Sequence, residues 1–437
     1  MSFSRYPKYK DSGVEWLGEV PECWGVTRIS RLFNIKAGGD IKEQFFSVNC
    51  TEKYCYPIYT NTIKSDVIYG FTSKAFFPGN TITVTGRGDI GYAVYRDHPY
   101  DAIIRLLVLT PKNNDSCKYS MYFINSILNF HGGNTAISQL STEQISPYLI
   151  LNPPLQEQFA IATFLDRETA KMDALVAEQE KLIAILKEKR QAVISHAVTK
   201  GLDPSVPMKD SGVEWLGEVP ESWERRKIAH AFERVGSGTT PPTGQDEWYS
   251  DGDIPWITTG ELRETVITET SKYVTAKALE EFSTLRVYPA GSLAIAMYGA
   301  TIGRLGILGV SATTNQACCV LSGEISLSIR FTYFWLLAFK QQIIDLYAAG
   351  GGQPNINQEV IANFRVPAPT IGDQVTITVF LDRETAKIDS LTAEAERGIV
   401  LLKERRSALI SAAVTGKIDV RAFLQIPTNE QPWRTHD

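Results

Sequence analysis

The sequence predicts an α+β fold: two similar mixed α/β domains, separated by two long helices that form an antiparallel coiled coil, with a pseudo-two-fold and circular organisation. Two internal repeats carry this prediction. The thirteen residues Lys10–Glu22 return unchanged at Lys209–Glu221, and the octapeptide Phe164–Lys171 returns at Phe380–Lys387. The chain therefore holds two copies of a unit of about 200 residues, which is too long for a solenoid or propeller repeat.

Each copy ends in a segment patterned as a long amphipathic helix, at about 156–198 and 372–414. Neither segment contains a proline, and apolar residues fall at the heptad-like spacings of a coiled coil. These residues are Leu165, Met172, Leu175, Leu182, Leu186 and Val193 in the first copy and Ile388, Leu391, Leu402 and Leu409 in the second. We expect the helices to pair through an isologous contact within one chain. The alternative is that each helix packs on its own domain.

Proline and glycine mark the ends of both helices. Pro153-Pro154 and Pro367-Ala368-Pro369 precede them, and Gly201 and Gly416 follow them, as expected for helix starts and stops. By the pseudo-two-fold, the residues after the second helix should lie close to the start of the chain near Lys10. The fold would then be effectively circular.

The regions 24–150 and 223–366 have a different texture, rich in Gly, Thr, Tyr, Ile and Val. Short alternating runs at 81–84 and 293–296 predict strands. These regions diverged between the copies, whereas the segments flanking the helices stayed nearly identical. A shared scaffold that holds two domains recognising different things explains this contrast. Two similar surfaces related by a two-fold suit an extended partner, and DNA is the obvious candidate.

Composition is that of an ordinary globular protein, with 43% hydrophobic and 21% charged residues. The six cysteines include no CxxC pair and the five histidines are scattered, so no zinc site is predicted. A signal core and an apolar run long enough to span a membrane are both absent, so we expect a cytoplasmic chain that makes no membrane contact. The net charge of −5 argues mildly against nucleic acid, but a local basic face can coexist with it.

Two short motifs could mislead. Gly86–Gly91 fits GxGxxG, but a dinucleotide site needs a helix after the motif, and the following residues 92–95 are strand-like. Asn152-Pro153-Pro154-Leu155 is close to the Asn-Pro-Pro-aromatic motif of adenine methyltransferases. That chemistry needs an aromatic ring to stack the flipped base, and Leu155 cannot supply one. Proline punctuation before a helix is the better interpretation.

The repeated segment Asp11–Glu22, followed by a tryptophan in both copies, resembles the segment that introduces a target-recognition domain in specificity subunits of type I restriction–modification enzymes. Pro153–Gln158 followed by Phe164–Asp166 resembles the start of that family's central helix. Tyr298–Gly303, Thr314–Gln316 and Gly351–Ile356 resemble recurrent features of its recognition domains. The resemblance covers nearly the whole chain, twice in the same order. Departures are Pro369–Gln374, where the family prefers Pro-Leu-x-Glu-Gln, and Thr85–Asp89, where the second copy keeps Gly-Ala-Thr.

The resemblance implies a non-catalytic subunit that reads a split DNA target, with one recognition domain for each half. It divides the chain into a first target-recognition domain (1–152), a first central helix (153–205), a second target-recognition domain (206–366), a second helix (367–425) and a tail (426–437). The implied partners are double-stranded DNA, two modification (methyltransferase) subunits docked on the helices, and restriction (translocase and nuclease) subunits. S-adenosylmethionine, ATP and Mg would belong to the partner subunits, and this chain would bind no cofactor.

Base readout needs hydrogen-bonding side chains on loops that a rigid scaffold positions. The candidate DNA contacts are Lys36, Gly38, Arg87, Tyr92, Asn134, Ser237, Thr239, Tyr298, Thr301, Arg304, Gln353 and Asn355. Asn315 and Gln316 could instead cap a turn inside the domain. Candidate docking residues on the helices are Asp166, Arg167, Glu168, Asp382, Arg383 and Glu384, for which a helix–helix contact is the alternative.

Two other function classes compete with DNA reading. A stand-alone DNA adenine methyltransferase would need a cofactor loop and a complete catalytic tetrapeptide, and neither stands out in this sequence. A coiled-coil adaptor without DNA binding would not explain two glycine-rich domains that diverged on one scaffold. A methyl-transfer assay on the chain alone separates the first alternative from a specificity subunit.

Overall fold

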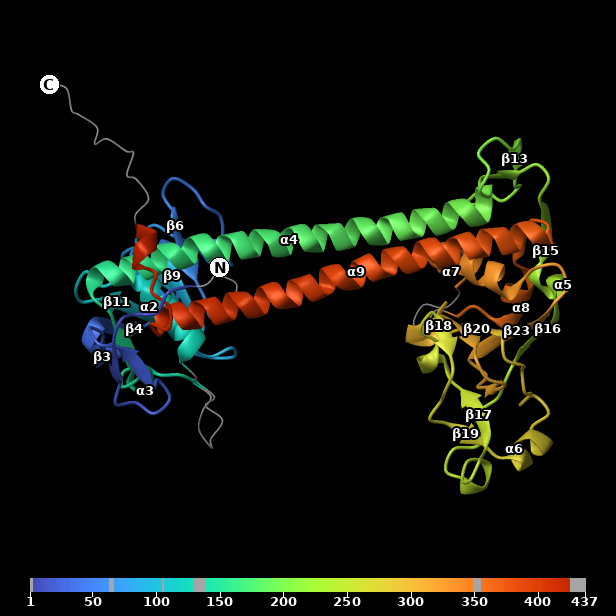
Figure 1. Cartoon of the computed structure of the whole chain (residues 1–437), viewed down its shortest axis with the longest axis horizontal. Coiled ribbons are helices and arrows are strands. Elements are labelled where there is room, and N and C mark those ends of the chain that lie inside the picture. Colours follow the sequence, from blue (N-terminus) through green and yellow to red (C-terminus); the bar gives the residue numbers. More distant parts are fainter. Residues whose placement is uncertain are drawn as a thin grey trace. The chain divides into compact units, whose positions relative to one another are not determined.

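The computed structural model describes residues 3–62, 67–103, 106–128, 130, 139–348 and 355–424. The chain divides into two compact units, the first formed by Met1–Glu180 with Glu396–Asp437 and the second by Lys181–Ala395 (Figure 1). Each unit therefore contains one α/β domain together with part of each long helix. The two long helices are α4 (Leu155–Lys200) and α9 (Ile371–Val414), as the sequence predicts.

Within each unit, α4 and α9 lie side by side in opposite directions (Figure 1). In the first unit the Arg406 guanidinium pairs with the Asp173 carboxylate at 2.9 Å. In the second unit Arg190 pairs with Asp389 at 2.8 Å. Arg190 and Arg406 occupy the same position of the repeat, as do Asp173 and Asp389. The predicted isologous pairing of the two helices is therefore confirmed.

The predicted apolar stripe is only partly buried. Leu165, Met172, Leu186 and Ile388 are at most 8% exposed, but Leu175, Leu182 and Leu391 are 42 to 51% exposed. These three positions keep the predicted heptad-like spacing but lie outside the buried seam between the helices. A pair of helices can bury only a narrow seam. A straight helix also drifts by about 20° per heptad away from a strict seven-residue repeat, which turns some heptad positions outward.

The first unit begins with the hairpin β1–β2 and then forms two four-stranded sheets, ordered β4-β11-β8-β9 and β10-β6-β7-β5. Its elements before α4 are β1 (Tyr9–Asp11), β2 (Glu19–Pro21), β3 (Gly25–Arg28), α1 (Ile29–Leu32), β4 (Phe33–Ala37), a 3-10 turn (Glu43–Phe45), β5 (Phe46–Ser47), β6 (Tyr56–Tyr59), β7 (Ile68–Thr72), β8 (Thr81–Thr85), β9 (Ala93–Arg96), β10 (Asp101–Ala102), β11 (Leu106–Pro111), α2 (Cys117–Ile127), α3 (Thr142–Ile145) and β12 (Leu149–Asn152).

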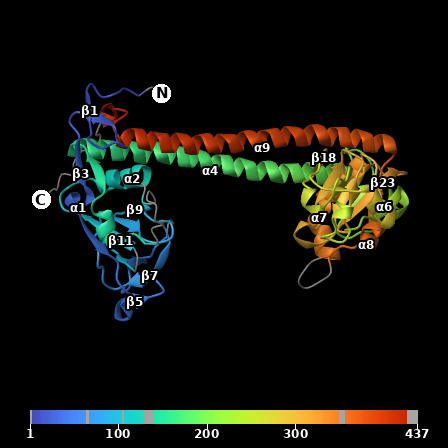
Figure 2. The ribbon, with the colours of Figure 1, turned by 90° about the horizontal axis from the view of Figure 1, so that it is seen from below.

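The central strands β8 and β11 of the first unit are buried on both faces. Ile82 and Leu109 point to the side covered by α2, whereas Val108 points to a small core around Tyr59 and Tyr100. Alternation along a strand sends successive side chains to opposite faces, so a strand between two cores is apolar throughout. Figure 2 shows α2 between this sheet and α4.

The second unit repeats this plan with a five-stranded sheet, ordered β16-β23-β20-β21-β18, and a three-stranded sheet, β19-β17-β22. Its elements between the long helices are β13 (Met208–Asp210), β14 (Glu218–Pro220), β15 (Glu224–Lys227), α5 (Ile228–Ala231), β16 (Phe232–Ser237), 3-10 turns at Asp246–Trp248, Thr259–Glu261 and Gly299–Thr301, β17 (Ile254–Ile257), β18 (Thr265–Ile267), β19 (Tyr273–Val274), α6 (Ala276–Glu281), β20 (Leu293–Ala296), β21 (Leu305–Leu308), β22 (Thr313–Thr314), β23 (Cys318–Glu324), α7 (Ile329–Tyr347), α8 (Gln358–Asn363) and β24 (Arg365–Ala368).

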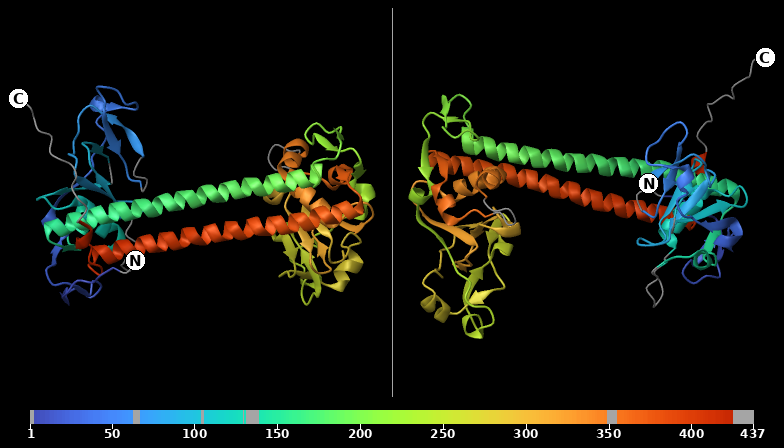
Figure 3. Two further views of the ribbon diagram at one scale, coloured as in Figure 1. Left: turned by 45° about the horizontal axis from the view of Figure 1, so that its top comes forward. Right: turned by 180° about the vertical axis from the view of Figure 1, so that it is seen from behind.

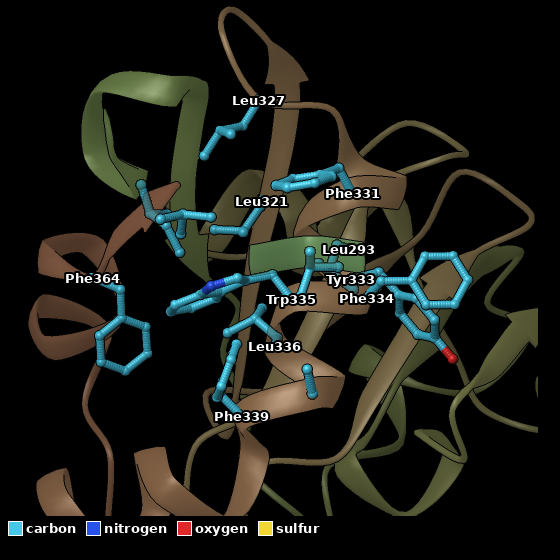
Figure 4. Packing of buried hydrophobic residues seen from close by; sticks show 14 of the residues in the cluster. Leu293, Leu321, Leu327, Phe331, Tyr333, Phe334, Trp335, Leu336, Phe339 and Phe364 are labelled. Atoms are coloured by element: carbon cyan, nitrogen blue, oxygen red, sulfur yellow. The ribbon is translucent and has the colours of Figure 1, made fainter. Parts of the chain in front are cut away.

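The core of the second unit lies between the five-stranded sheet and α7. Figure 4 shows Trp335 at its centre, between Leu321 on the sheet side and Phe364 and Phe339. Trp335 is 1% exposed, and its ring is 5.6 Å from that of Phe339. The predicted strands 81–84 and 293–296 are confirmed as β8 and β20, which hold equivalent central places in the two sheets.

A buried glutamine fixes the start of each long helix. The Gln158 side chain accepts a hydrogen bond from the Ser116 backbone N–H and donates to the Pro153 carbonyl. Gln374 repeats this arrangement, accepting from the Ser328 N–H and donating to the Pro369 carbonyl. Ser116 and Ser328 are the N-caps of α2 and α7, so each glutamine ties a long helix to the first turn of its domain's own helix.

The two ends of the described chain meet in the first unit (Figure 3). The Asp419 N–H donates to the Ser4 carbonyl at 2.8 Å, and the Tyr9 hydroxyl donates to the Gly416 carbonyl at 2.9 Å. The expected circular organisation is therefore confirmed. A last 3-10 turn spans Arg421–Leu424. None of the helices in the described part of the chain is both long and apolar enough to cross a membrane.

Candidate DNA interface and docking surfaces

The hairpin between β8 and β9 displays the first group of candidate DNA contacts. Arg87 and Tyr92 are exposed at its tip. The loop itself is fixed: the Thr85 hydroxyl donates to the Asp89 carbonyl and accepts from the Tyr92 N–H at 2.9 Å. Two strands flank the GxGxxG motif, so the expected helix of a dinucleotide site is not there. The hairpin offers a rigid tip with polar side chains, as base or phosphate contact requires.

Asn61 is a positioning residue that sequence reasoning missed. Its side-chain oxygen accepts from the Gly86 N–H at 2.8 Å and the Arg87 N–H at 3.2 Å. Its side-chain nitrogen donates to the Arg87 carbonyl. Asn61 follows β6, in the neighbouring sheet, and nothing in its local pattern marks it. The sequence could not reveal its role because the contact joins segments 25 residues apart.

Lys36 and Gly38 stand at the end of β4, where they play different parts. Lys36 is exposed. Gly38 has a packing reason to be glycine, because a Cβ there would lie 2.5 Å from the Ala102 carbonyl oxygen. The equivalent Gly238 would place a Cβ 1.6 Å from the Thr314 carbonyl oxygen. Close approach of two strands explains both glycines, so the DNA-binding role of Gly38 stays a prediction.

The second unit brings several candidates together at one end of its sheet. Tyr298 forms a β-bridge with Asn355, and the Thr301 hydroxyl donates to the Tyr298 carbonyl at 3.4 Å. The Trp256 indole N–H donates to the Thr239 carbonyl at 3.2 Å. Tyr298, Thr301, Arg304, Ser237 and Thr239 are all partly exposed. Asn134 and Gln353 lie outside the described residues.

Asn315 and Gln316 link the loops of this cluster. The Asn315 N–H donates to the Ile257 carbonyl at 3.1 Å, and its own carbonyl accepts from the Cys318 N–H at 3.2 Å. These backbone contacts place Asn315 in a turn, which was one of its two predicted roles. The Gln316 side chain accepts from the Thr240 hydroxyl. The buried oxygens of the Thr313, Thr314 and Asn315 side chains have no hydrogen-bond partner among the described residues.

Each aspartate of the repeated octapeptide holds its helix to its own domain. The Asp166 carboxylate accepts from Lys118 at 2.5 Å and from the Tyr122 hydroxyl at 2.9 Å, both on α2. Asp382 accepts from Arg330 on α7. The sequence left docking and a helix–helix contact open, and the structure shows a third use, a helix–domain contact. That internal use accounts for the aspartate in both copies, and its docking role stays a prediction.

The other charged residues of the octapeptide form the same surface network twice. Glu168 accepts from Arg167 and from Lys171, both at 2.9 Å, and these hydrogen bonds, led by that of Lys171, lower the pKa of its carboxyl. Glu384 accepts from Arg383 at 3.0 Å and Lys387 at 2.9 Å. We call these the Arg–Glu–Lys networks of the first and second unit. They remain at the surface, where a partner can reach them.

Within the part of the chain that the structure describes, no group of three or more His, Cys, Asp or Glu side chains could hold a metal ion. The Asn152 side chain, part of the motif that is close to that of methyltransferases, accepts a hydrogen bond from Gln158 at 2.9 Å. The Asn-Pro-Pro sequence thus leads into α4 and braces its first turn. This supports the structural interpretation of the motif.

Comparison with known proteins identifies the class. The family profile of the type I restriction modification DNA specificity domain matches residues 21–184 and again residues 220–397. The chain therefore belongs to this family, with one specificity domain in each copy, and is of the non-catalytic, DNA-recognition kind.

Two relatives and one solved structure illustrate the likeness. The specificity subunit of the Escherichia coli enzyme EcoR124I/EcoR124II is 24% identical over 69% of this chain and 71% of its own length. A Methanocaldococcus jannaschii protein assigned as the specificity subunit of the type I enzyme MjaX is 22% identical over 93% of this chain and 96% of its own. A solved chain of a type I restriction–modification system has the same fold, with a TM-score of 0.65 at 14% identity, over 90% of this chain and 98% of that chain.

Proposed function

We propose that this specificity subunit reads a split DNA target, with the β8–β9 hairpin contacting one half-site and the loops around β20–β21 contacting the other. The observation that carries the proposal is that equivalent strands in the two units hold loops of different chemistry. The first loop offers Arg87 and Tyr92, and the second offers Tyr298, Thr301 and Arg304. Arginine suits guanine edges and phosphates, and a framework with exchanged polar groups suits two different half-sites.

The partners of this subunit would be modification subunits, two in number, which carry the methyl-transfer chemistry with S-adenosylmethionine. Restriction subunits with their ATP-dependent chemistry would join them. Support comes from apolar residues that are exposed at the same place in both copies: Leu155 and Ile371, Phe159 and Val375, Leu175 and Leu391, Ile185 and Leu401. Each is at least 42% exposed. Exposed apolar groups that recur at equivalent positions of the two long helices are typical of protein-binding surfaces.

Methylome mapping tests the reading of DNA. The chain is co-expressed with the modification subunit of its own system, and methylated adenines are mapped across the genome. We expect one split motif with a fixed gap. Exchange of residues 24–150 for those of another specificity subunit should change one half of the motif and leave the other. Methylation that changes in both halves, or that ignores the exchange, contradicts the proposal.

A point variant sharpens this test. Arg87→Ala should weaken binding to the target by about 1–3 kcal/mol and relax one position of one half-site if Arg87 reads a base. If Arg87 contacts a phosphate, binding should weaken equally for all sequences, with a smaller salt dependence. Arg31→Ala is the matched control, because Arg31 is exposed in α1, just before β4, at the end of the sheet away from the hairpin. Equal losses for both variants would remove the hairpin from the DNA interface.

A further inference from the structure

A cavity of about 320 Å³ lies beside the first turns of α9 in the second unit, lined by Trp223, Asp373 and Ile377 together with residues from 200–206 after α4. One turn further along, the Phe380 ring is partly exposed, and the Arg383 guanidinium lies 5.8 Å from its centre. Asp373 and Phe380 lie seven residues apart, two turns of the same helix face. We call this surface the second-unit groove.

The equivalent surface of the first unit is filled by the chain's own ends. Phe164, the copy of Phe380, is 3% exposed, with the ring of Phe3 5.6 Å away and that of Phe423 5.1 Å away. The Arg167 guanidinium lies 6.0 Å from the Phe164 ring and 5.6 Å from that of Phe423. An aromatic ring therefore packs beside the repeated phenylalanine and its arginine. Aromatic and cation–π contacts of this kind stabilise such packing.

The deeper part of the first-unit surface is filled as well. Glu157, the copy of Asp373, is 8% exposed and accepts from the Tyr6 hydroxyl at 3.0 Å and the Trp24 indole N–H at 2.9 Å. Asp373 is exposed, and its hydrogen bonds are with Thr370 in its own first turn. The cavity of the second unit thus corresponds to the place that the Tyr6 side chain takes in the first.

Side-chain burial at the start of α4 and of α9 also differs between the two units. Ala160 is 2% exposed, whereas its copy Thr376 is exposed. The difference has a simple origin: the amino- and carboxyl-terminal segments of the chain meet in the first unit, while one continuous segment passes through this place in the second. Phe380 and Arg383 nevertheless match Phe164 and Arg167.

We propose that the second-unit groove is the first docking site for a methyltransferase subunit, which inserts an aromatic side chain beside Phe380. Residues 417–423 close the equivalent surface of the first unit, so a second methyltransferase subunit must displace them. This inference rests on the proposed function. The methyltransferase is the fitting occupant because the groove is continuous with the Arg–Glu–Lys network of the second unit through Arg383. That network is part of the proposed docking surface.

The test is a titration of the full-length chain with the methyltransferase subunit of its own system, read by native mass spectrometry. The wild-type chain should load one subunit at least about tenfold more tightly than the second. Phe380→Ala, and independently Thr376→Arg, should weaken the first binding step by at least about tenfold, as truncation or blocking of an aromatic anchor does. Phe423→Ala should tighten the second step, because it opens the first-unit surface.

Leu346→Ala is the matched control, because Leu346 is 56% exposed on α7 and does not line the groove. It should leave both steps unchanged. Equal affinities for the two steps in the wild-type chain, or normal first-step binding by both Phe380→Ala and Thr376→Arg, would overturn this inference while leaving the proposed function standing. Failure of the wild-type chain to bind any methyltransferase subunit would overturn both. Thermal melting of each variant identifies a loss that is due to unfolding.

Discussion

The two units share one framework but differ in what covers the start of their long helix. In the first unit Glu157 is buried and holds Tyr6 and Trp24, whereas the equivalent Asp373 of the second unit is exposed. The central paired strands (β11 with β8, β23 with β20), the buried glutamines and the reciprocal Arg–Asp pairs recur in both units. Duplication therefore yields equivalent scaffolds with inequivalent surfaces, because a chain has its ends in one place only.

The largest expected effect comes from removing the Trp24 indole, which helps to hold the chain's terminal segments over the start of α4 in the first unit. Trp24 is fully buried, so Trp24→Ala should cost about 3–5 kcal/mol through the cavity it leaves. Hydrogen exchange resolved by peptide should show lost protection in residues 3–62 and 417–424, with the second unit retaining its protection. Equal loss in both units would mean that they do not unfold as separate bodies.

A pair of carboxylate variants tests the comparison directly. Glu157→Ala leaves the Tyr6 hydroxyl and the Trp24 indole N–H without their acceptor, which should cost about 1–3 kcal/mol. Asp373→Ala at the equivalent exposed position should change stability by less than about 0.5 kcal/mol. Urea unfolding monitored by tryptophan fluorescence measures both. Similar losses in the free energy of unfolding for the two variants would show that Glu157 and Asp373 contribute equally and that the two units do not differ at this position.

Acid should loosen residues 417–423, which close the surface at the start of α4 in the first unit. Hydrogen bonds from Arg421 hold the pKa of the Asp419 carboxyl below its ordinary value. A carboxyl with a depressed folded-state pKa stabilises the fold above its unfolded pKa of about 3.9, and this contribution is lost as pH falls through the lower folded value. The methyl signals of Val420 in NMR spectra should therefore shift in that window. Asp419→Asn should abolish the shift, and a shift that persists in this variant would exclude Asp419 as its cause.

Cysteine labelling perturbs the protein least, and it should rank the cysteines clearly by their rate of alkylation. Burial raises the pKa of the Cys117 and Cys318 thiols to about 12, and it also raises that of Cys319. The thiolate is the reactive form, so these three should resist alkylation at pH 8, while Cys50 and Cys55 react quickly. Mass spectrometry after iodoacetamide treatment reports each site. Fast labelling of Cys117 in the native state would show that the first unit opens readily.

Periodicity predicted the long helices and the strands at 81–84 and 293–296 because a local repeat of side chains is enough to define them. It did not predict which face each helix buries. Leu175 and Leu391 keep the heptad spacing and are still half exposed. Similarly, the repeated aspartates were recognised as important, but their partners Lys118 and Arg330 lie 48 and 52 residues away. Contacts of that separation are set by packing, which a single sequence does not encode in any local pattern.

The candidate DNA contacts show the same division. Loop chemistry indicated Arg87 and Tyr298, and the structure places both on loops at strand ends. The supporting Asn61 was not predicted, and Gly38 was selected for a role that close strand packing already explains. The position of these polar side chains on loops was therefore accessible from sequence, and their role in DNA contact stays a prediction. The backbone contacts that support the loops were not accessible from sequence.

The nesting of the units sets an order for folding during synthesis. The second unit is one continuous stretch, Lys181–Ala395, inserted within the first. The first unit needs contacts such as that between Tyr119 and Val414, which are 295 residues apart. On the ribosome, the second unit can close while the first still lacks the last turns of α9. The first part of the first unit is thus translated before the second unit and completed after it. Until then its apolar surface stays exposed to solvent or to chaperones.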